Sequence, residues 1–201
     1  MSEVLLDMAM SLDGFAIDRD GDSMFPANDL KGTLALAEMI ASTGAVIMDQ
    51  EFYDDVHHDF TNYAYQVPVF VVTEKPSHYI TKGQNQKLKF IFVTDGIFHA
   101  IKMARSAAKK KNVAIVGGVK LAQMALEAGL VDILKVRLIN IIASKGTRLF
   151  DHLNDQRIKL ETIYVKEFNH RTDLCFKIVR YKYFAEETIH GQQNEESALH
   201  N

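Results

Sequence analysis

Four short runs of consecutive apolar residues constrain the fold of this chain more than any other feature of its sequence. The runs are rich in Val, Ile and Phe, and they occupy residues 45–48, 69–72, 90–93 and 113–116. Apolar residues without polar alternation over four positions are typical of a strand that is covered on both faces. We therefore predict that these runs are strands of a sheet with further layers packed on both sides.

Helical patterns separate some of these predicted strands. The segments with apolar residues at helical spacing are 29–42, 97–110 and 119–128. In the first segment, the apolar residues that recur at intervals of four, three and four are Leu30, Leu34, Ala37 and Ala41. Gly129 follows the third segment, and helices commonly end in a left-handed glycine. Strands that alternate with helices predict a parallel or mostly parallel sheet flanked by helices.

The last third of the chain has a different pattern. Residues 131–142 alternate apolar side chains with basic ones, namely Lys135 and Arg137. Two long strand candidates follow at 158–168 and 174–184. The hairpin loop 169–173 joins them. These elements predict an antiparallel hairpin at the C-terminal end of the sheet. The apolar phase changes inside the last strand, so we predict a β-bulge near Ile178 and Val179.

The domain organisation follows from the distribution of polar residues. Residues 1–184 contain no internal repeat and no Ser-, Gly- or Pro-rich linker, so we predict one continuous domain. Residues 185–201 are acidic and polar, with few side chains that could be buried. Such a segment cannot offset the entropy lost on ordering, and we predict that it is a disordered polar tail.

Composition excludes several functional classes. The chain has 23 basic and 26 acidic residues, and its formal net charge of -3 gives no bulk attraction to nucleic acid or anionic lipid. Its single cysteine cannot form an internal disulfide, and no apolar run approaches the length of a membrane span. The early acids Glu3 and Asp7 argue against a secretory signal. We therefore expect a cytoplasmic protein whose partner is a small molecule.

The strongest local motif is a pair of glycines between a strand and a helix. Gly117 and Gly118 follow the apolar run at 113–116, and a helical pattern begins directly after them. Glycines allow a ligand to approach the backbone closely, and a helix N-terminus favours an anion. This arrangement is typical of nucleotide binding at the carboxyl end of a strand. The motif lacks the third glycine of a Rossmann fingerprint, so a plain tight turn is an open alternative.

Three further polar motifs follow predicted strands, the first of which is a strand at Val4–Ala9. They are the Asp13-Gly14 turn with its neighbours, the segment 49–53, and Thr73-Glu74. The carboxyl ends of parallel strands meet at one edge of a sheet, where ligands bind in open α/β folds. We therefore expect these motifs and the glycine pair to surround one site. The adjacent His57 and His58 point apart and have no third ligand nearby, so we predict no metal site.

Taken in order, these segments resemble the dihydrofolate reductase-like superfamily. The chain is most similar to the reductase domain of the bifunctional riboflavin-biosynthesis deaminase–reductase and to its stand-alone bacterial relatives. The matching segments, which extend over about residues 3–184, are 11–15, 44–48 with Tyr53, 71–73, 116–118 with Leu121, 129–132 and 146–150. The resemblance implies an α/β fold with a mostly parallel central sheet flanked by helices and an antiparallel C-terminal hairpin.

The resemblance also implies an activity and a site. It implies a homodimeric reductase that uses NADPH or NADH on a small heterocyclic or carbonyl substrate, such as a riboflavin-pathway pyrimidine or a pterin-like compound. The residues that correspond to the pyrophosphate site are Gly117, Gly118, Val119, Lys120 and Leu121. Those that correspond to the adenosine side are Asp49, Gln50, Glu51 and Thr73. The first loop, with Leu12, Gly14 and Phe15, would border the substrate.

Two carboxylates are the candidate catalytic residues. Asp29 lies at the start of the first predicted helix and corresponds loosely to the substrate-binding carboxylate of the family. Asp13 lies in the first loop. Each has a structural alternative, because Asp29 can complement a helix dipole and Asp13 can serve a tight turn.

The chain departs from the family where the cofactor phosphate would bind. Asp49, Glu51 and Glu74 stand where the family usually has glycine or basic residues, and residues 49–60 contain five acids and no Lys or Arg. We interpret the basic residues of segment 97–110 and Lys111 as a solvated face. An acidic site repels a phosphate, so we predict that NADPH binding is weakened, replaced by NADH binding, or lost. A non-catalytic binding module that kept the fold is the alternative function.

Overall fold

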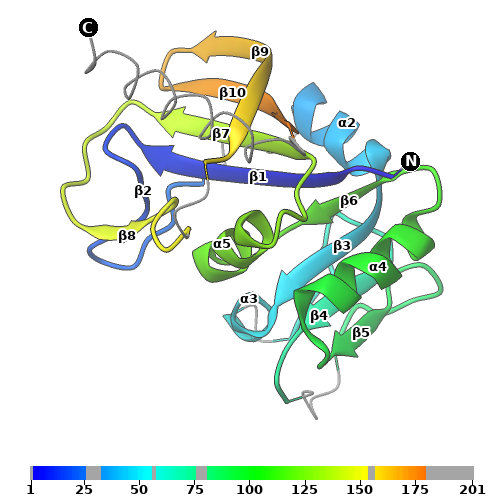
Figure 1. Cartoon of the computed structure of the whole chain (residues 1–201). Helices are drawn as coiled ribbons and strands as arrows, with labels where there is room; N and C mark the ends of the chain where they lie inside the picture. Colours follow the sequence, from blue (N-terminus) through cyan, green and yellow to red (C-terminus); the bar gives the residue numbers. More distant parts are fainter. Residues whose placement is uncertain (1, 26–32, 56–57, 76–80, 154–156, 180–201) are drawn as a thin grey trace, which may run out of the picture.

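A twisted eight-stranded sheet forms the centre of the computed structural model, which describes residues 2–25, 33–55, 58–75, 81–153 and 157–179 (Figure 1). The strand order in the sheet is β5-β4-β3-β6-β1-β7-β10-β9. These strands are β1 (Val4–Ser11), β3 (Thr43–Asp49), β4 (Val69–Val72), β5 (Phe90–Val93), β6 (Asn112–Ile115), β7 (Ile133–Ile139), β9 (Lys159–Phe168) and β10 (Arg171–Val179). All four predicted apolar runs are strands of this sheet.

The strands from β5 to β7 in this order are mutually parallel, and β10 and β9 continue the sheet antiparallel. This arrangement confirms the predicted fold class. The expectation that all four runs are covered on both faces is wrong for β5. It is an edge strand, and Phe90, Ile91 and Phe92 are only half-buried. An edge strand has a neighbour on one side, so fewer side chains cover it.

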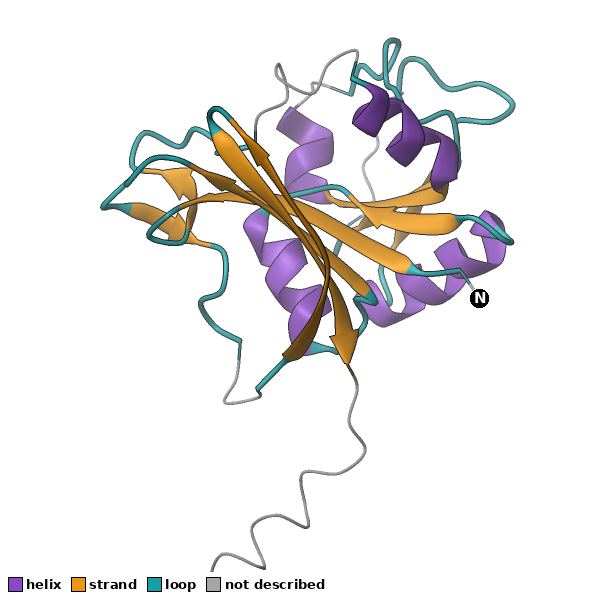
Figure 2. Ribbon diagram, turned by 90° about the horizontal axis from the view of Figure 1, so that it is seen from above, coloured by secondary structure: helices purple, strands orange, loops and turns teal. Residues whose placement is uncertain are grey.

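One face of the sheet packs against the helices α4 (Gly96–Ala108) and α5 (Val119–Glu127) (Figure 2). The predicted helical face of α4 is confirmed, since Ile97, Ile101, Ala104 and Ala108 are all buried. The contact between α4 and β3 is so close that a Cβ at Gly44 would lie 2.7 Å from the carbonyl oxygen of Ala108. Gly129 has a φ of +62° after α5, as predicted for a helix end.

The opposite face carries α2 (Leu34–Ser42) and the segment 59–65. The predicted buried side of this helix was wrong, because the part of it that the structure describes exposes Leu34, Ala37 and Ala41. Met39 and Ile40 pack against the core instead. Small and large apolar residues occur all round this helix, so the spacing alone could not select the packed side. Asp29 lies outside the described residues, as does the tail 185–201.

The C-terminal hairpin forms as predicted, with a shorter turn and a different bulge. β10 already begins at Arg171, so the turn is shorter than the predicted loop. The register shifts between Cys175 and Phe176, and Ile163 of β9 is the residue without a partner. The bulge predicted near Ile178 is therefore wrong. β10 pairs without interruption with β7 on its other side, so the extra residue is accommodated in the outer strand β9.

Two short strands, β2 (Phe15–Asp18) and β8 (Gly146–Arg148), form a separate antiparallel ribbon beside the ends of β1 and β7 (Figure 1). The short helix α3 (Gln50–Asp55) directly follows β3. No helix in the described ranges is long and apolar enough to span a membrane.

Candidate functional site

The glycine turn lies at the carboxyl edge of the sheet, between the ends of β6 and β3. Gly118 is the N-cap of α5, and its N–H donates a hydrogen bond of 2.9 Å to Oδ2 of Asp49. The other oxygen, Oδ1, accepts the N–H of Phe52 at 2.8 Å. One carboxylate therefore joins the first turns of α5 and α3. It also contributes a negative charge where both helix dipoles favour one.

Asp49 is close enough to explain why both turn residues are glycine. A Cβ at Gly117 would lie 2.9 Å from Cδ2 of Leu121 and 3.2 Å from Oδ2 of Asp49. A Cβ at Gly118 would lie 3.1 Å from the same oxygen. The N–H group of the turn that could bind a ligand anion thus binds the carboxylate of Asp49.

The other residues predicted to bind the pyrophosphate differ in what they can offer. Val119 and Leu121 are buried, so they can reach a ligand only through backbone N–H groups. Lys120 is exposed. At the adenosine side, Gln50 donates to Asp54, and the hydroxyl of Thr73 donates to the carbonyl of Lys75. These strand ends share the edge of the sheet with the glycine turn, as expected.

Arg105 of α4 does not reach this edge. Arg105 contacts Asp132 at 2.5 Å, and Asp132 also accepts the N–H of Val4 at the start of β1. That pair lies at the amino edge of the sheet, opposite the glycine turn. The acids Glu51 and Glu74 are exposed at the carboxyl edge, where Lys75 is the adjacent basic side chain.

Asp13 holds the first loop against a second one. Its carboxylate accepts hydrogen bonds from the Ser11 hydroxyl at 2.6 Å and from the backbone N–H groups of Ala143 and Ser144 at 3.0 and 2.8 Å. These bonds, led by that from Ser11, lower the pKa of Asp13 to about 2. A carboxylate with this pKa is ionised at neutral pH, and its hydrogen bonds anchor the first loop to the segment that contains Ala143 and Ser144.

The residues predicted to border the substrate lie in the same loop. Leu12 is 64% exposed, whereas the ring of Phe15 is buried beneath the guanidinium of Arg148, at 4.4 Å from its centroid. Gly14 has a φ of +90°, which favours glycine, and its carbonyl accepts the N–H of Leu149. The loop is therefore held by the segment 141–149.

A buried charged cluster across β1, β7 and β10 escaped the sequence analysis. Arg137 lies 2.6 Å from Asp7 and 2.8 Å from Asp173, and Arg171 lies 2.9 Å from the other oxygen of Asp173. Burial raises the pKa of Asp7, and the Arg137 guanidinium opposes this shift. Asp7 Oδ1 and Arg137 Nε are buried without a hydrogen-bond partner. The alternation of 131–142 gave no sign that Arg137 is buried, but Asp7, a charged residue inside the apolar run of β1, was a signal for a buried pair.

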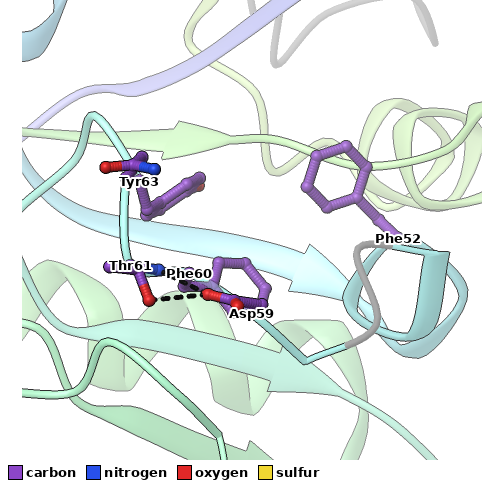
Figure 3. Close-up of a pocket in the computed structure, with 6 residues that line it drawn as sticks. Phe52, Asp59, Phe60, Thr61 and Tyr63 are labelled. Atoms are coloured by element: carbon purple, nitrogen blue, oxygen red, sulfur yellow. Dashed lines mark hydrogen bonds between the residues drawn. The ribbon is translucent and has the colours of Figure 1, made fainter.

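A cavity of about 490 Å³ lies beside α3 (Figure 3). It is lined by Phe52, Asp59, Phe60, Thr61, Asn62 and Tyr63. No motif in the sequence identified these residues, because all but Phe52 belong to one irregular segment. Within the described part of the chain, no three His, Cys, Asp or Glu side chains are grouped as metal ligands.

Comparison with known proteins shows the fold. No family model matches the chain, and no curated protein matches it in sequence. A putative riboflavin biosynthesis protein from Shewanella sp. PV-4 superposes with a TM-score of 0.69 at 20% identity, over 90% of this chain and 100% of that one. The Saccharomyces riboflavin biosynthesis reductase superposes with a TM-score of 0.58 at 11% identity, over 89% and 90% of the two chains.

A longer protein from Thermotoga maritima is also similar. It is described as a diaminohydroxyphosphoribosylaminopyrimidine deaminase/5-amino-6-(5-phosphoribosylamino)uracil reductase and has a TM-score of 0.65 at 16% identity. The match includes 89% of this chain and 57% of that protein, so this chain spans little more than half of it. The chain therefore has the dihydrofolate reductase-like fold of riboflavin-pathway reductases, as the sequence resemblance predicted.

Proposed function

We propose that this protein is a reductase of a small heterocyclic or carbonyl compound and that a nicotinamide nucleotide donates the hydride. The observation that carries the proposal is the glycine turn at the carboxyl edge of a sheet with this fold. The proteins with similar structures include reductases named for riboflavin biosynthesis, which supports the reaction class. The chain's own task is to hold the compound beside the nicotinamide and to exclude water.

The turn as it stands does not fit the cofactor diphosphate. Asp49 occupies the N–H of Gly118 that a phosphate oxygen would use, and its carboxylate would face a second anion. Two anions that compete for the same N–H group repel each other strongly. A diphosphate can therefore bind there only if the Asp49 side chain leaves the turn. The exposed Glu51 and Glu74 extend the negative charge toward the adenosine side. We expect weak nucleotide binding, with NADH preferred over NADPH.

A second candidate function rests on the same contact. A carboxylate that replaces a ligand phosphate on the turn is compatible with a protein that kept the fold and lost the cofactor. In that case the chain is a non-catalytic module that binds a nucleotide or another small ligand. Absence of nucleotide binding in the wild type and the Asp49 variants would favour this second candidate, whereas nucleotide binding alone is compatible with both.

The decisive experiment measures NADH and NADPH binding by calorimetry. We expect Asp49→Gly, which removes the competing anion, to bind both nucleotides at least about tenfold more tightly than the wild type. Asp49→Asn keeps the side-chain volume and removes the charge, so it separates electrostatic from steric competition. Asp55→Asn is the matched control, because Asp55 is an exposed acid at the end of α3, the helix that directly follows Asp49. It should change either affinity less than about twofold.

The result that contradicts the reductase proposal is also clear. If neither nucleotide binds to the wild type or to Asp49→Gly at millimolar concentration, the non-catalytic module is the better description. Thermal unfolding of each variant, measured in parallel, shows whether a lost affinity reflects a lost fold.

The expected homodimer is part of the proposal. β9 is the outer strand of the sheet, and several of its apolar side chains are well exposed, namely Leu160, Ile163, Val165 and Phe168. An exposed apolar edge strand is prone to pair with another chain. A second copy of this chain would cover it.

A further inference from the structure

The outer edge of β9 is an unpaired sheet edge ten residues long. β9 lies beyond β10 as the last strand in the sheet order, and each of its residues except Tyr164 is exposed (Figure 1). Within the described part of the chain, its outward N–H and C=O groups therefore face no further strand. Exposed edges that carry apolar side chains pair readily with the edge of another strand. The order of the side chains along β9 indicates which strand fits this edge.

The bulge at Ile163 changes which residues of β9 share a face. Thr162 is opposite Phe176 on β10, and Val165 is opposite Leu174, two residues away. Side chains two residues apart in a regular strand point to the same face, and directly opposite side chains do as well. Thr162 and Val165 therefore share a face although they are three residues apart. A regular strand would place them on opposite faces.

The same reasoning places two opposite charges on the other face of β9. Glu161 is opposite Lys177 and Lys166 is opposite Asp173, and these two residues of β10 are four positions apart. Glu161 and Lys166 are both exposed. The ammonium of Lys166 lies 4.9 Å from the ring centroid of Tyr164, whose side chain points to this same face. The cation is thus held over the face that carries Glu161.

A second copy of this chain, related by a two-fold axis perpendicular to the sheet, can pair with this edge. The axis makes the two β9 strands antiparallel and keeps each face of the sheet continuous across the contact. With Thr162 opposite the partner's Val165, the paired side chains point to the same face. Glu161 is then opposite Lys166 of the partner subunit, and the symmetry repeats both pairs. Opposite charges in directly opposite positions stabilise a pair of strands.

Other registers of this pairing are less favourable. A shift of one residue would bring side chains on different faces opposite each other. A shift of two residues in one direction would place Lys159 opposite the partner's Lys166, and like charges in that position repel. The same shift in the other direction would place Glu161 opposite the partner's Phe168 and lose both charge pairs. The bulge and the charges therefore select one register.

We propose that two copies of this chain pair antiparallel along β9, with Glu161 of each copy opposite Lys166 of the partner subunit. The pairing joins the two eight-stranded sheets into one continuous sheet. The inference rests on the homodimer of the proposed function, and it specifies the residues through which the two copies meet.

Disulfide cross-linking tests the register directly. Directly opposite residues of antiparallel strands have Cα atoms about 4.5–5.5 Å apart, which is within the range of a disulfide. The double variant Thr162→Cys with Val165→Cys should therefore form intermolecular disulfides after mild oxidation, seen as a dimer band in non-reducing gel electrophoresis. Within one copy the two cysteines are three residues apart, roughly 10 Å in an extended strand, and cannot bond to each other. The native Cys175 is buried.

Three matched variants control this experiment. Thr162→Cys alone and Val165→Cys alone should give no covalent dimer, because neither residue is opposite itself in the proposed register. Leu160→Cys with Val165→Cys should also give none, because these residues are opposite each other only after a shift of two residues. A covalent dimer of this last variant in place of the first would show a different register and overturn the inference.

Charge variants test the pairs of Glu161 with Lys166 through the dimer dissociation constant, measured by sedimentation equilibrium. Glu161→Lys and Lys166→Glu should each weaken the dimer at least about fivefold, because each replaces two attractions with two repulsions. The variant with both changes should form a tighter dimer than either single variant. Glu38→Lys is the control, since Glu38 is an exposed acid on α2 and the net charge changes equally. It should change the constant less than about twofold.

Each outcome decides the inference. A wild type that is monomeric at 0.1 mM overturns it, as does a dimer that the Thr162 and Val165 cysteines fail to link. Charge variants that leave the dimer unchanged also overturn it. No nucleotide or substrate is present in these experiments, so their failure leaves the reductase proposal standing. A cross-linked dimer that binds neither NADH nor NADPH refutes the reductase proposal alone.

Discussion

Single aspartates have the largest local effects in this protein, because each accepts backbone N–H groups from a distant segment. Asp49 joins the starts of α3 and α5, and its hydrogen bond to Gly118 spans 69 residues of the sequence. Asp13 joins two loops, and its bond to Ser144 spans 131 residues. Carboxylates that accept several N–H groups are strong local anchors. Their residue type suggested acid–base chemistry or turns, whereas the structure shows what they contact.

We predict that Asp13→Asn makes the stability of the protein less dependent on acid pH. The folded pKa of Asp13, about 2, is below the 3.8 of an ordinary aspartate, so its ionised form is favoured by folding. This contribution is fully present above pH 4 and is lost as the pH falls toward 2. Asp13→Asn should therefore be less stable than the wild type at pH 6, and the difference should shrink at about pH 2.

Denaturant unfolding at both pH values measures this difference. Asp151→Asn serves as the control, because Asp151 is an exposed acid. An Asp13→Asn variant as stable as the wild type at pH 6 would show that the loop contacts contribute nothing to folding.

At the scale of elements, a buried charge cluster joins three strands. Arg137 of β7 is 6% exposed and bridges Asp7 of β1 and Asp173 of β10. Alternation in 131–142 correctly predicted the strand. It could not predict that the polar side is covered, because burial depends on segments from elsewhere in the chain. Buried ion pairs tolerate the loss of one partner poorly.

We predict that Arg137→Met lowers the free energy of unfolding by about 3–5 kcal/mol, because it leaves the buried Asp7 without its cation and Asp173 with Arg171 alone. The loss should be smaller at low pH, where Asp7, whose pKa burial raises, binds a proton. Lys177→Met, an exposed change on β10, should stay within about 0.5 kcal/mol of the wild type.

A second variant tests the cause. Adding Asp7→Asn to Arg137→Met removes the unpaired carboxylate and should recover part of the stability. If the double variant is less stable than Arg137→Met alone, uncompensated charge is not the reason for the loss.

At the scale of the whole molecule, the sheet is covered along most of its width and open at β9. Every residue of this strand except Tyr164 is exposed, with Ile163 and Val165 each 52% exposed. The six parallel strands that carry the candidate site lie at the other side of β10. Assembly through β9 would thus leave the glycine turn accessible.

We predict that the protein is a dimer at micromolar concentration and that Ile163→Lys with Val165→Lys converts it to a monomer. Two added lysines on an edge strand oppose pairing with another edge. Sedimentation velocity measures the change. Phe98→Lys, an equally exposed apolar position on α4, should remain dimeric. A monomeric wild type at 0.1 mM would contradict the proposed assembly.

Features that depend on neighbours in the sequence were predicted correctly, whereas features that depend on contacts between distant segments were not. Strands 69–72 and 90–93 were predicted to the residue, because consecutive apolar residues report local burial. The packed side of α2 and the position of the bulge were not, because each depends on which neighbour the element meets. The glycine turn was identified from the sequence, yet the Asp49 contact that fills it was not.

The sequence by itself determined the order of strands and helices, and thereby a mostly parallel sheet with its polar motifs at one edge. Periodicity and glycine placement suffice for this, since they act between near neighbours along the chain. Only the tertiary structure decided that Asp49 occupies the anion position, that Arg137 is buried between two acids, and that Phe52 and Tyr63 line the same cavity. These relations join residues distant in sequence, and their distances depend on how the layers pack.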